Sequence, residues 1–139
     1  MLIHGSDHGT NDQWFSSLDF YAGYPCLQKV FYNNISSLDL NEYVVPVPLD
    51  SLNCYNVMKN FSIHPEIVHI DGGHDYDCVS IDLKNWWELL TPNGIMIMDD
   101  YYDDGISWVG VKSAVDDFLK INEHYRFEHR EGKARFFKP

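Results

Sequence analysis

The chain has 139 residues, of which 45% are hydrophobic and 15% aromatic, so we expect one domain over residues 1–139 with a sizeable core. Its formal net charge of −11 argues against nucleic acid as a partner, because phosphate binding needs a basic face. We expect no membrane span, since no window of about 18 apolar residues exists, and no signal peptide at Met1. The three cysteines match no zinc-site spacing, so free thiols in a reducing cytoplasm are the simplest interpretation.

The first half of the chain gives weak structural signals. Residues 1–24 are rich in glycine, serine and aspartate without clear periodicity and predict loop. Within this stretch, residues 13–18 predict a short helix. After it, the spacing of apolar residues predicts helices over residues 25–35 and 52–61 and a strand over residues 43–47. Pro46 places that strand at a sheet edge or makes it end abruptly.

The second half has clear periodicity. Apolar residues at steps of three and four predict helices over residues 77–90 and 110–119. Apolar runs predict strands over residues 66–70 and 95–98, and two more strands, 125–127 and 134–137, flank a turn at Glu131–Gly132. The alternation of strand and helix predicts βαβ units, a parallel sheet and thus an α/β fold, with a hairpin at the C-terminal end.

Acidic side chains gather where the two central strands end. Asp71 follows the first strand, and Asp99 and Asp100 follow the second. One crossover helix separates these strands, so they should be adjacent and parallel, with three carboxylates at one edge of the sheet. A hard divalent cation, Mg²⁺ first and Mn²⁺ or Ca²⁺ next, would relieve the repulsion between them. The alternative is that such aspartates face water or cap helices, as Asp75 or Asp77 could.

Histidines accompany these carboxylates. His74 lies three residues after Asp71 in a glycine-containing loop, within reach of a metal-bound hydroxyl, and a histidine suits the work of a general base. A purely structural role is the alternative. We expect His69 to be packed in the core. The aromatic residues that follow the second strand either line an acceptor pocket or belong to the core; they are Tyr101, Tyr102 and Trp108.

The run IVHIDGGHDYDCVSIDLKNWWELLTPNGIMIMDDYY, followed by GVKSAVDDF, resembles class I S-adenosylmethionine-dependent methyltransferases. Within that class it is most similar to the metal-dependent sugar and natural-product O-methyltransferases of the macrocin O-methyltransferase type. The resemblance covers about residues 25–120 and is specific over residues 67–118. It implies a Rossmann-like methyltransferase sheet, mostly parallel with a C-terminal antiparallel hairpin. It also implies methyl transfer from S-adenosylmethionine to a hydroxyl of a small molecule or sugar.

The same resemblance assigns roles to individual residues. It implies a metal site formed by Asp71, Asp99 and Asp100. It implies His74 as the base, and it places Asp50 and Ser51, in the segment PLDS, near the cofactor adenine. Asn93 stands where relatives have glycine, and we expect little consequence from this difference.

The beginning of the chain departs from the family pattern. It contains no GxGxxG-like stretch, and MLIHGSDHGT resembles the segment that follows the second strand in relatives. We therefore expect a sheet that lacks the first one or two strands, with a second copy or a complementing chain as a possible partner. The alternatives are a misassigned start and a truncated methyltransferase-like domain without catalysis.

An iron site is a second chemical alternative. His69 and Asp71 form an H-x-D pair, and His124 or His129 follows downstream, which is the ligand order of non-haem Fe(II) oxygenases. The helical patterns beside this pair argue against such a site, because those enzymes are usually all-β barrels.

Overall fold

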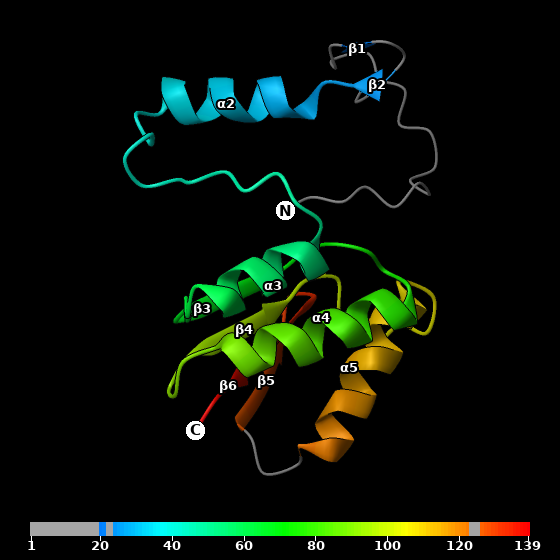
Figure 1. Cartoon of the computed structure of the whole chain (residues 1–139). Coiled ribbons are helices and arrows are strands. Elements are labelled where there is room, and N and C mark those ends of the chain that lie inside the picture. Colours follow the sequence, from blue (N-terminus) through cyan, green and yellow to red (C-terminus); the bar gives the residue numbers. More distant parts are fainter. Residues whose placement is uncertain (1–19, 22–23, 123–125) are drawn as a thin grey trace. The chain divides into compact units, whose positions relative to one another are not determined.

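The computed structural model describes residues 20–21, 24–122 and 126–139 (Figure 1). The chain divides into two compact units, a larger one that contains Pro48–Pro139 and a smaller one that ends at Val47. The single domain expected from the sequence stays a prediction. The helix expected over residues 13–18 lies outside the described residues.

The smaller unit contains two short strands and one helix. Strands β1 (Phe20–Tyr21) and β2 (Tyr24–Pro25) pair antiparallel, and helix α2 spans Leu27–Ser37. This helix confirms the one expected over residues 25–35, shifted by two residues at each end. The strand expected over residues 43–47 is wrong, because Tyr43 lies in a turn and residues 44–47 pair with none of the described strands. The proline at position 46 cannot donate the hydrogen bond that a ladder needs.

The sheet of the larger unit has four strands in the order β3-β4-β6-β5. Their bounds are β3 Ile67–Ile70, β4 Ile95–Met98, β5 Arg126–Arg130 and β6 Lys133–Phe137. Strands β3 and β4 are parallel, whereas β6 pairs antiparallel with both β4 and β5. The α/β class and the C-terminal hairpin are confirmed. The expectation of a mostly parallel sheet is wrong for the described strands, because the hairpin returns β6 antiparallel onto β4.

Three helices complete the larger unit: α3 Ser51–Asn60, α4 Tyr76–Leu89 and α5 Val109–Ile121. They confirm the three helices expected in this part of the sequence, with ends shifted by one or two residues. Helix α4 begins where the side chain of Asp75 accepts a hydrogen bond of 2.9 Å from the backbone N–H of Cys78, which is the capping role considered for Asp75. It ends where Lys138 Nζ donates to the carbonyl oxygens of Trp87 and Leu90, both at 2.7 Å.

The connection from α4 to β4 accommodates asparagine where the resemblance implies glycine. Asn93 has a φ of 63°, in the left-handed region that glycine adopts most easily. Asparagine is among the side chains that tolerate this conformation best. Asparagine therefore fits the turn at this position.

The core of the larger unit lies where α4 and α5 meet the sheet. Leu83 of α4 and Val111 of α5 are fully buried, and so are Met96 of β4 and Phe136 of β6. Alternate residues of β4 and β6 share this buried face, because successive side chains of a strand point to opposite sides. The carboxyl ends of β3 and β4 thus extend from a rigid core.

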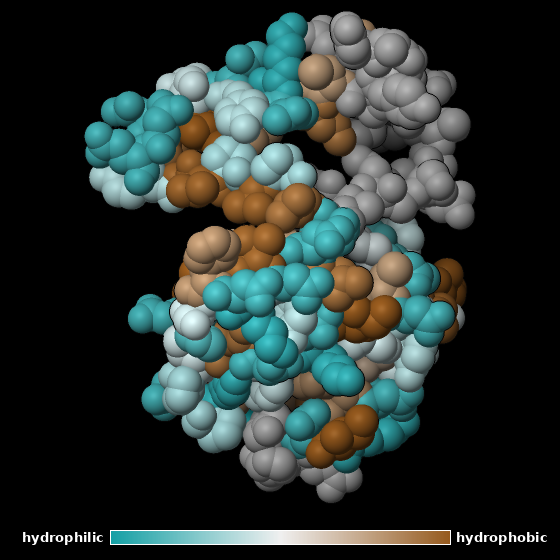
Figure 2. All heavy atoms as spheres, in the orientation of Figure 1, coloured by the Kyte–Doolittle hydropathy of each residue, from teal (hydrophilic) through white to brown (hydrophobic). Residues whose placement is uncertain are grey.

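The surface mixes hydrophilic and hydrophobic residues, as the patches of teal and brown in Figure 2 show. Large apolar side chains stay exposed, for example Ile106 at 85% and Ile121 at 80%. None of the helices in the described part of the chain is both long and apolar enough to cross a membrane. Cys26, Cys54 and Cys78 are free thiols, as expected.

Candidate functional site

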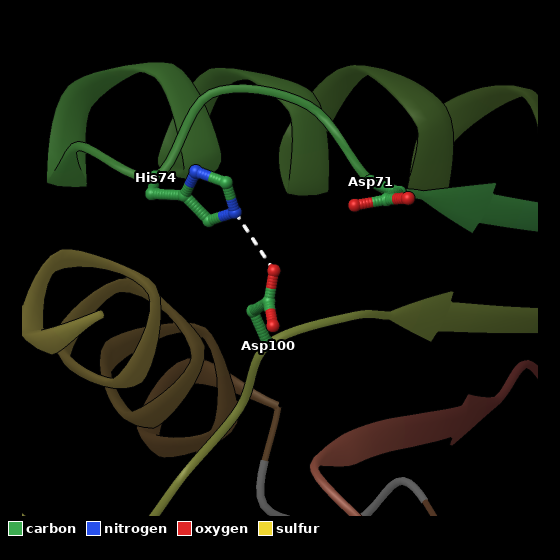
Figure 3. Close-up of side chains that lie close together, drawn as sticks. All are labelled: Asp71, His74 and Asp100. Atoms are coloured by element: carbon green, nitrogen blue, oxygen red, sulfur yellow. Dashed lines mark hydrogen bonds and ion pairs between the residues drawn. The ribbon is translucent and has the colours of Figure 1, made fainter. Parts of the chain in front are cut away.

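The candidate site forms at the carboxyl ends of the parallel strands β3 and β4. The register pairs Ile70 with Met98, so the residues that follow the two strands start side by side. Asp71, His74 and Asp100 each offer a ligand atom, and these atoms all lie within 4.8 Å of one another (Figure 3). We call these three residues the acidic-imidazole group. The structure therefore brings together two of the three predicted carboxylate ligands and the predicted base.

His74 is held on two sides. Its Nε2 lies 2.8 Å from Asp100 Oδ2 (Figure 3), and its ring stacks on Trp108 with centroids 3.9 Å apart and an interplanar angle of 19°. Only 17% of the His74 side chain is exposed. The imidazole is thus fixed in orientation while one ring nitrogen faces the carboxylates.

The backbone at Asp100 turns sharply after β4. Its φ of 57° lies in the left-handed region, which costs on the order of 1–3 kcal/mol for a residue other than glycine. The N–H of Asp100 donates to Asp99 Oδ1 at 3.0 Å, and this bond supports the turn. The turn directs the carboxylate of Asp100 toward His74. The strained backbone conformation thus orients one member of the site.

Asp99 lies outside the acidic-imidazole group, although the resemblance implied that it is a metal ligand. Its Oδ2 accepts a hydrogen bond from Lys133 Nζ and lies 3.2 Å from His69 Nε2. Burial alone would raise the pKa of Asp99, but the bonds from Lys133 and from the Asp100 backbone outweigh it and hold the pKa below its ordinary value.

His69 is not the core residue that the sequence predicted. Its side chain is 47% exposed, and it reaches the carboxylate of Asp99 rather than the interior. The apolar run IVHI suggested full burial. In the described sheet β3 pairs only with β4, so this strand stays partly open to solvent.

The predicted cofactor residues line a pocket of about 460 Å³ between β3, α3 and α4. Its lining includes Asp50, Ser51, Asp71, Gly72, Gly73 and Asp82. Asp71 thus belongs to both the pocket and the acidic-imidazole group. Asp50 also caps α3, accepting from the backbone N–H of Asn53 at 2.9 Å, and this bond lowers the pKa of Asp50.

Ser51 connects α3 to α4. Its hydroxyl donates to Asp82 Oδ1 at 2.5 Å and accepts from Trp86 Nε1 at 2.8 Å. Asp82 lines the same pocket, and no role was predicted for it from the sequence. Asp82 lies in the run HDYDCVSIDLKNWW that carries the family resemblance, and this was the signal that could have found it. Burial raises the pKa of Asp82 above its ordinary value, and the bond from Ser51 offsets only part of this effect.

Asp82→Asn is expected to stabilise the protein more at pH 7 than at pH 4. A carboxyl whose pKa is raised on folding binds its proton more tightly in the folded state, so the contribution of Asp82 to stability falls as the pH rises through the raised pKa. Asparagine keeps an acceptor for Ser51 and cannot ionise. Urea unfolding at both pH values checks this, and an equal effect at pH 4 and pH 7 would contradict it. Asp77→Asn, at an exposed position of the same helix, is the matched control.

The iron alternative lacks a matching geometry among the described residues. His69 contacts Asp99 instead of forming a group with Asp71, and the ring of His129 packs against Tyr101 with centroids 4.7 Å apart. His124 lies outside the described residues. Within the part of the chain that is described, the acidic-imidazole group is the only set of three such side chains that could hold a metal.

Residues 5–101 match the sequence model of a family described as a methyltransferase domain. The chain belongs to this methyltransferase-domain family. The match includes the acidic-imidazole group and the pocket residues Asp50 and Ser51, and it ends before α5 and the β5–β6 hairpin. Lys133, the partner of Asp99, therefore lies outside the residues that match the family. No curated protein matches the chain.

Proposed function

We propose that the chain is an S-adenosylmethionine-dependent O-methyltransferase that uses a divalent cation, Mg²⁺ first, to act on a hydroxyl of a small molecule or sugar. Membership of the methyltransferase-domain family supports methyl transfer. The observation that carries the finer proposal is the acidic-imidazole group, whose three ligand atoms lie within 4.8 Å of one another at the strand ends. Its member Asp71 also lines the neighbouring pocket.

The donor set of the group fits a hard cation. Carboxylate oxygens are the side-chain ligands that Mg²⁺ prefers, and two ligands on opposite sides of the ion lie roughly 4 Å apart. The ligand atoms of the group lie within 4.8 Å of one another, which is close to this value. Asp71 and Asp100 are the proposed ligands. The resemblance adds Asp99 as a third, and in the structure Asp99 is bound to Lys133.

The pocket supports the cofactor part of the proposal. Asp50 and Ser51, which the resemblance places near the adenine, line the same pocket as Asp71. A volume of about 460 Å³ falls within the range of small-molecule sites. One pocket thus joins the proposed adenine contacts to the acidic-imidazole group.

The proposed chemistry divides between bound groups and the chain. When bound, S-adenosylmethionine supplies the methyl group, and the cation lowers the pKa of the acceptor hydroxyl. We propose His74 as the base at Nε2. This nitrogen now lies 2.8 Å from Asp100 Oδ2, and it would take the hydroxyl proton with Asp100 bound to the cation instead and the ring proton on Nδ1. Trp108 holds the imidazole plane by stacking, which keeps that nitrogen in position during the transfer.

Calorimetric titration of the full chain tests the two parts of this proposal separately. We expect heat of binding with S-adenosylmethionine, and heat of binding with Mg²⁺ that Asp71→Asn weakens by about tenfold or more. Asp39→Asn is the matched control, since Asp39 is exposed and its φ of 55° suits asparagine equally well. No heat with the cofactor would leave the non-catalytic domain as the better account, and cofactor binding without Mg²⁺ binding would reject the metal.

A further inference from the structure

We propose that Lys133 is a positioning residue of the acidic-imidazole group. Through its ion pair with Asp99 it withholds that carboxylate from the cation and so limits the carboxylate ligands to Asp71 and Asp100. This inference rests on the proposed metal site and departs from the three-aspartate ligand set that the resemblance implies.

The backbone fixes Lys133 beside the site. The antiparallel register of β4 and β6 pairs Met98 with Ala134, so the next positions, Asp99 and Lys133, face each other. The ladder continues past them, because the N–H of Tyr101 donates to the carbonyl of Gly132 at 2.9 Å. Lys133 is therefore held in register by backbone bonds on both sides of Asp99.

Both oxygens of Asp99 are engaged. Oδ2 accepts from Lys133 and lies 3.2 Å from His69 Nε2, and Oδ1 accepts from the Asp100 N–H at 3.0 Å. Lys133 and His69 occupy the lone pairs of Oδ2, so a cation would reach Asp99 only at the remaining lone pair of Oδ1 or by displacing one of these partners. Loss of the Oδ1 bond would also release the left-handed turn that directs Asp100 toward His74.

Lys133 also supplies positive charge to the site. Its side chain is an ammonium at neutral pH, as lysine side chains ordinarily are, and its Nζ donates to Asp99 Oδ2. An incoming divalent cation meets this ammonium next to its proposed ligands. Both effects, the engaged Asp99 and the nearby charge, act against binding of the cation.

The test measures Mn²⁺ binding to the full chain by electron paramagnetic resonance. Lys133→Met is expected to tighten Mn²⁺ binding by about tenfold, the size that removal of a nearby charge at a protein surface gives. Lys133→Arg keeps the charge and the ion pair and should leave the affinity unchanged. Lys59→Met is the matched control, since Lys59 makes a comparable 2.7 Å ion pair with Glu88 away from the site.

The double variant K133M/D99N separates the role of Asp99 from that of charge. It has the same net charge as the wild type and cannot offer Asp99 as a ligand, so its affinity should return to the wild-type value. Water-proton relaxation should show fewer waters on Mn²⁺ in K133M than in the wild type, because the freed carboxylate replaces one of them. A gain that persists in the double variant would overturn the proposal, since Lys133 would then act without Asp99.

The outcomes distinguish this inference from the proposed function. Equal Mn²⁺ affinity of the wild type and K133M rejects the role of Lys133 and leaves the metal site intact. Binding to K133M alone supports the role of Lys133 and rejects a metal in the wild type. If Mn²⁺ binds neither the wild type nor K133M, both proposals are rejected.

Discussion

Gly110→Ala is expected to lower the free energy of unfolding by about 3 kcal/mol, the upper end of the usual cost of overpacking. A methyl carbon at position 110 would lie 2.4 Å from the carbonyl oxygen of His74 and 2.8 Å from the amide nitrogen of Tyr76. Both are backbone atoms, so no side-chain rotation relieves the overlap. Either α5 or the loop that carries His74 must move, and urea unfolding followed by tryptophan fluorescence measures the cost.

The same substitution should also disturb the site. A shift of the loop would lengthen the 2.8 Å contact between His74 and Asp100, and we expect weaker Mn²⁺ binding. Ser113→Ala, on an exposed position of the same helix, should change stability by less than about 0.5 kcal/mol. If G110A kept both its stability and its Mn²⁺ affinity, the close contact between α5 and this loop could not be what fixes His74.

Local periodicity was enough to predict most elements of the larger unit. Helix α4 shows why: its apolar residues recur at helical spacing, and Asp75 stands where a cap is needed. The failed strand over residues 43–47 shows the limit, because an apolar run becomes a strand only if another strand pairs with it. The direction of β6 against β4 is likewise a long-range choice that no local pattern records.

In the candidate site, too, local features were predicted and long-range features were not. The strand-helix-strand connection predicted that Asp71 and Asp100 would come together, and the structure brings them within 4.8 Å of one another. The sequence could not separate Asp99 from Asp100, because no local pattern records the left-handed turn at Asp100 that directs its carboxylate toward His74. It also could not find Lys133, because the partner of Asp99 depends on the register of β6.

Phe136→Ala should cost about 3–5 kcal/mol, as truncation of a large buried aromatic side chain usually does. The ring is fully buried, and its centroid lies 5.3 Å from that of Phe118, 5.4 Å from Phe127 and 6.4 Å from Trp87. It therefore joins β6 to α5, β5 and α4, and alanine would leave a cavity among all four elements. Domains are typically stable by about 5–15 kcal/mol, so this loss is a large share of the total.

A matched variant shows that the cost comes from burial. Phe61→Ala removes the same side chain at a site where it is 75% exposed, and urea unfolding should show a change below about 0.5 kcal/mol. Because Phe136 and Lys133 lie on the same strand, F136A should also loosen β6 and the ion pair to Asp99. Equal small losses in F136A and F61A would mean that β6 is not anchored by its aromatic core, and the fixed position of Lys133 would lose its physical basis.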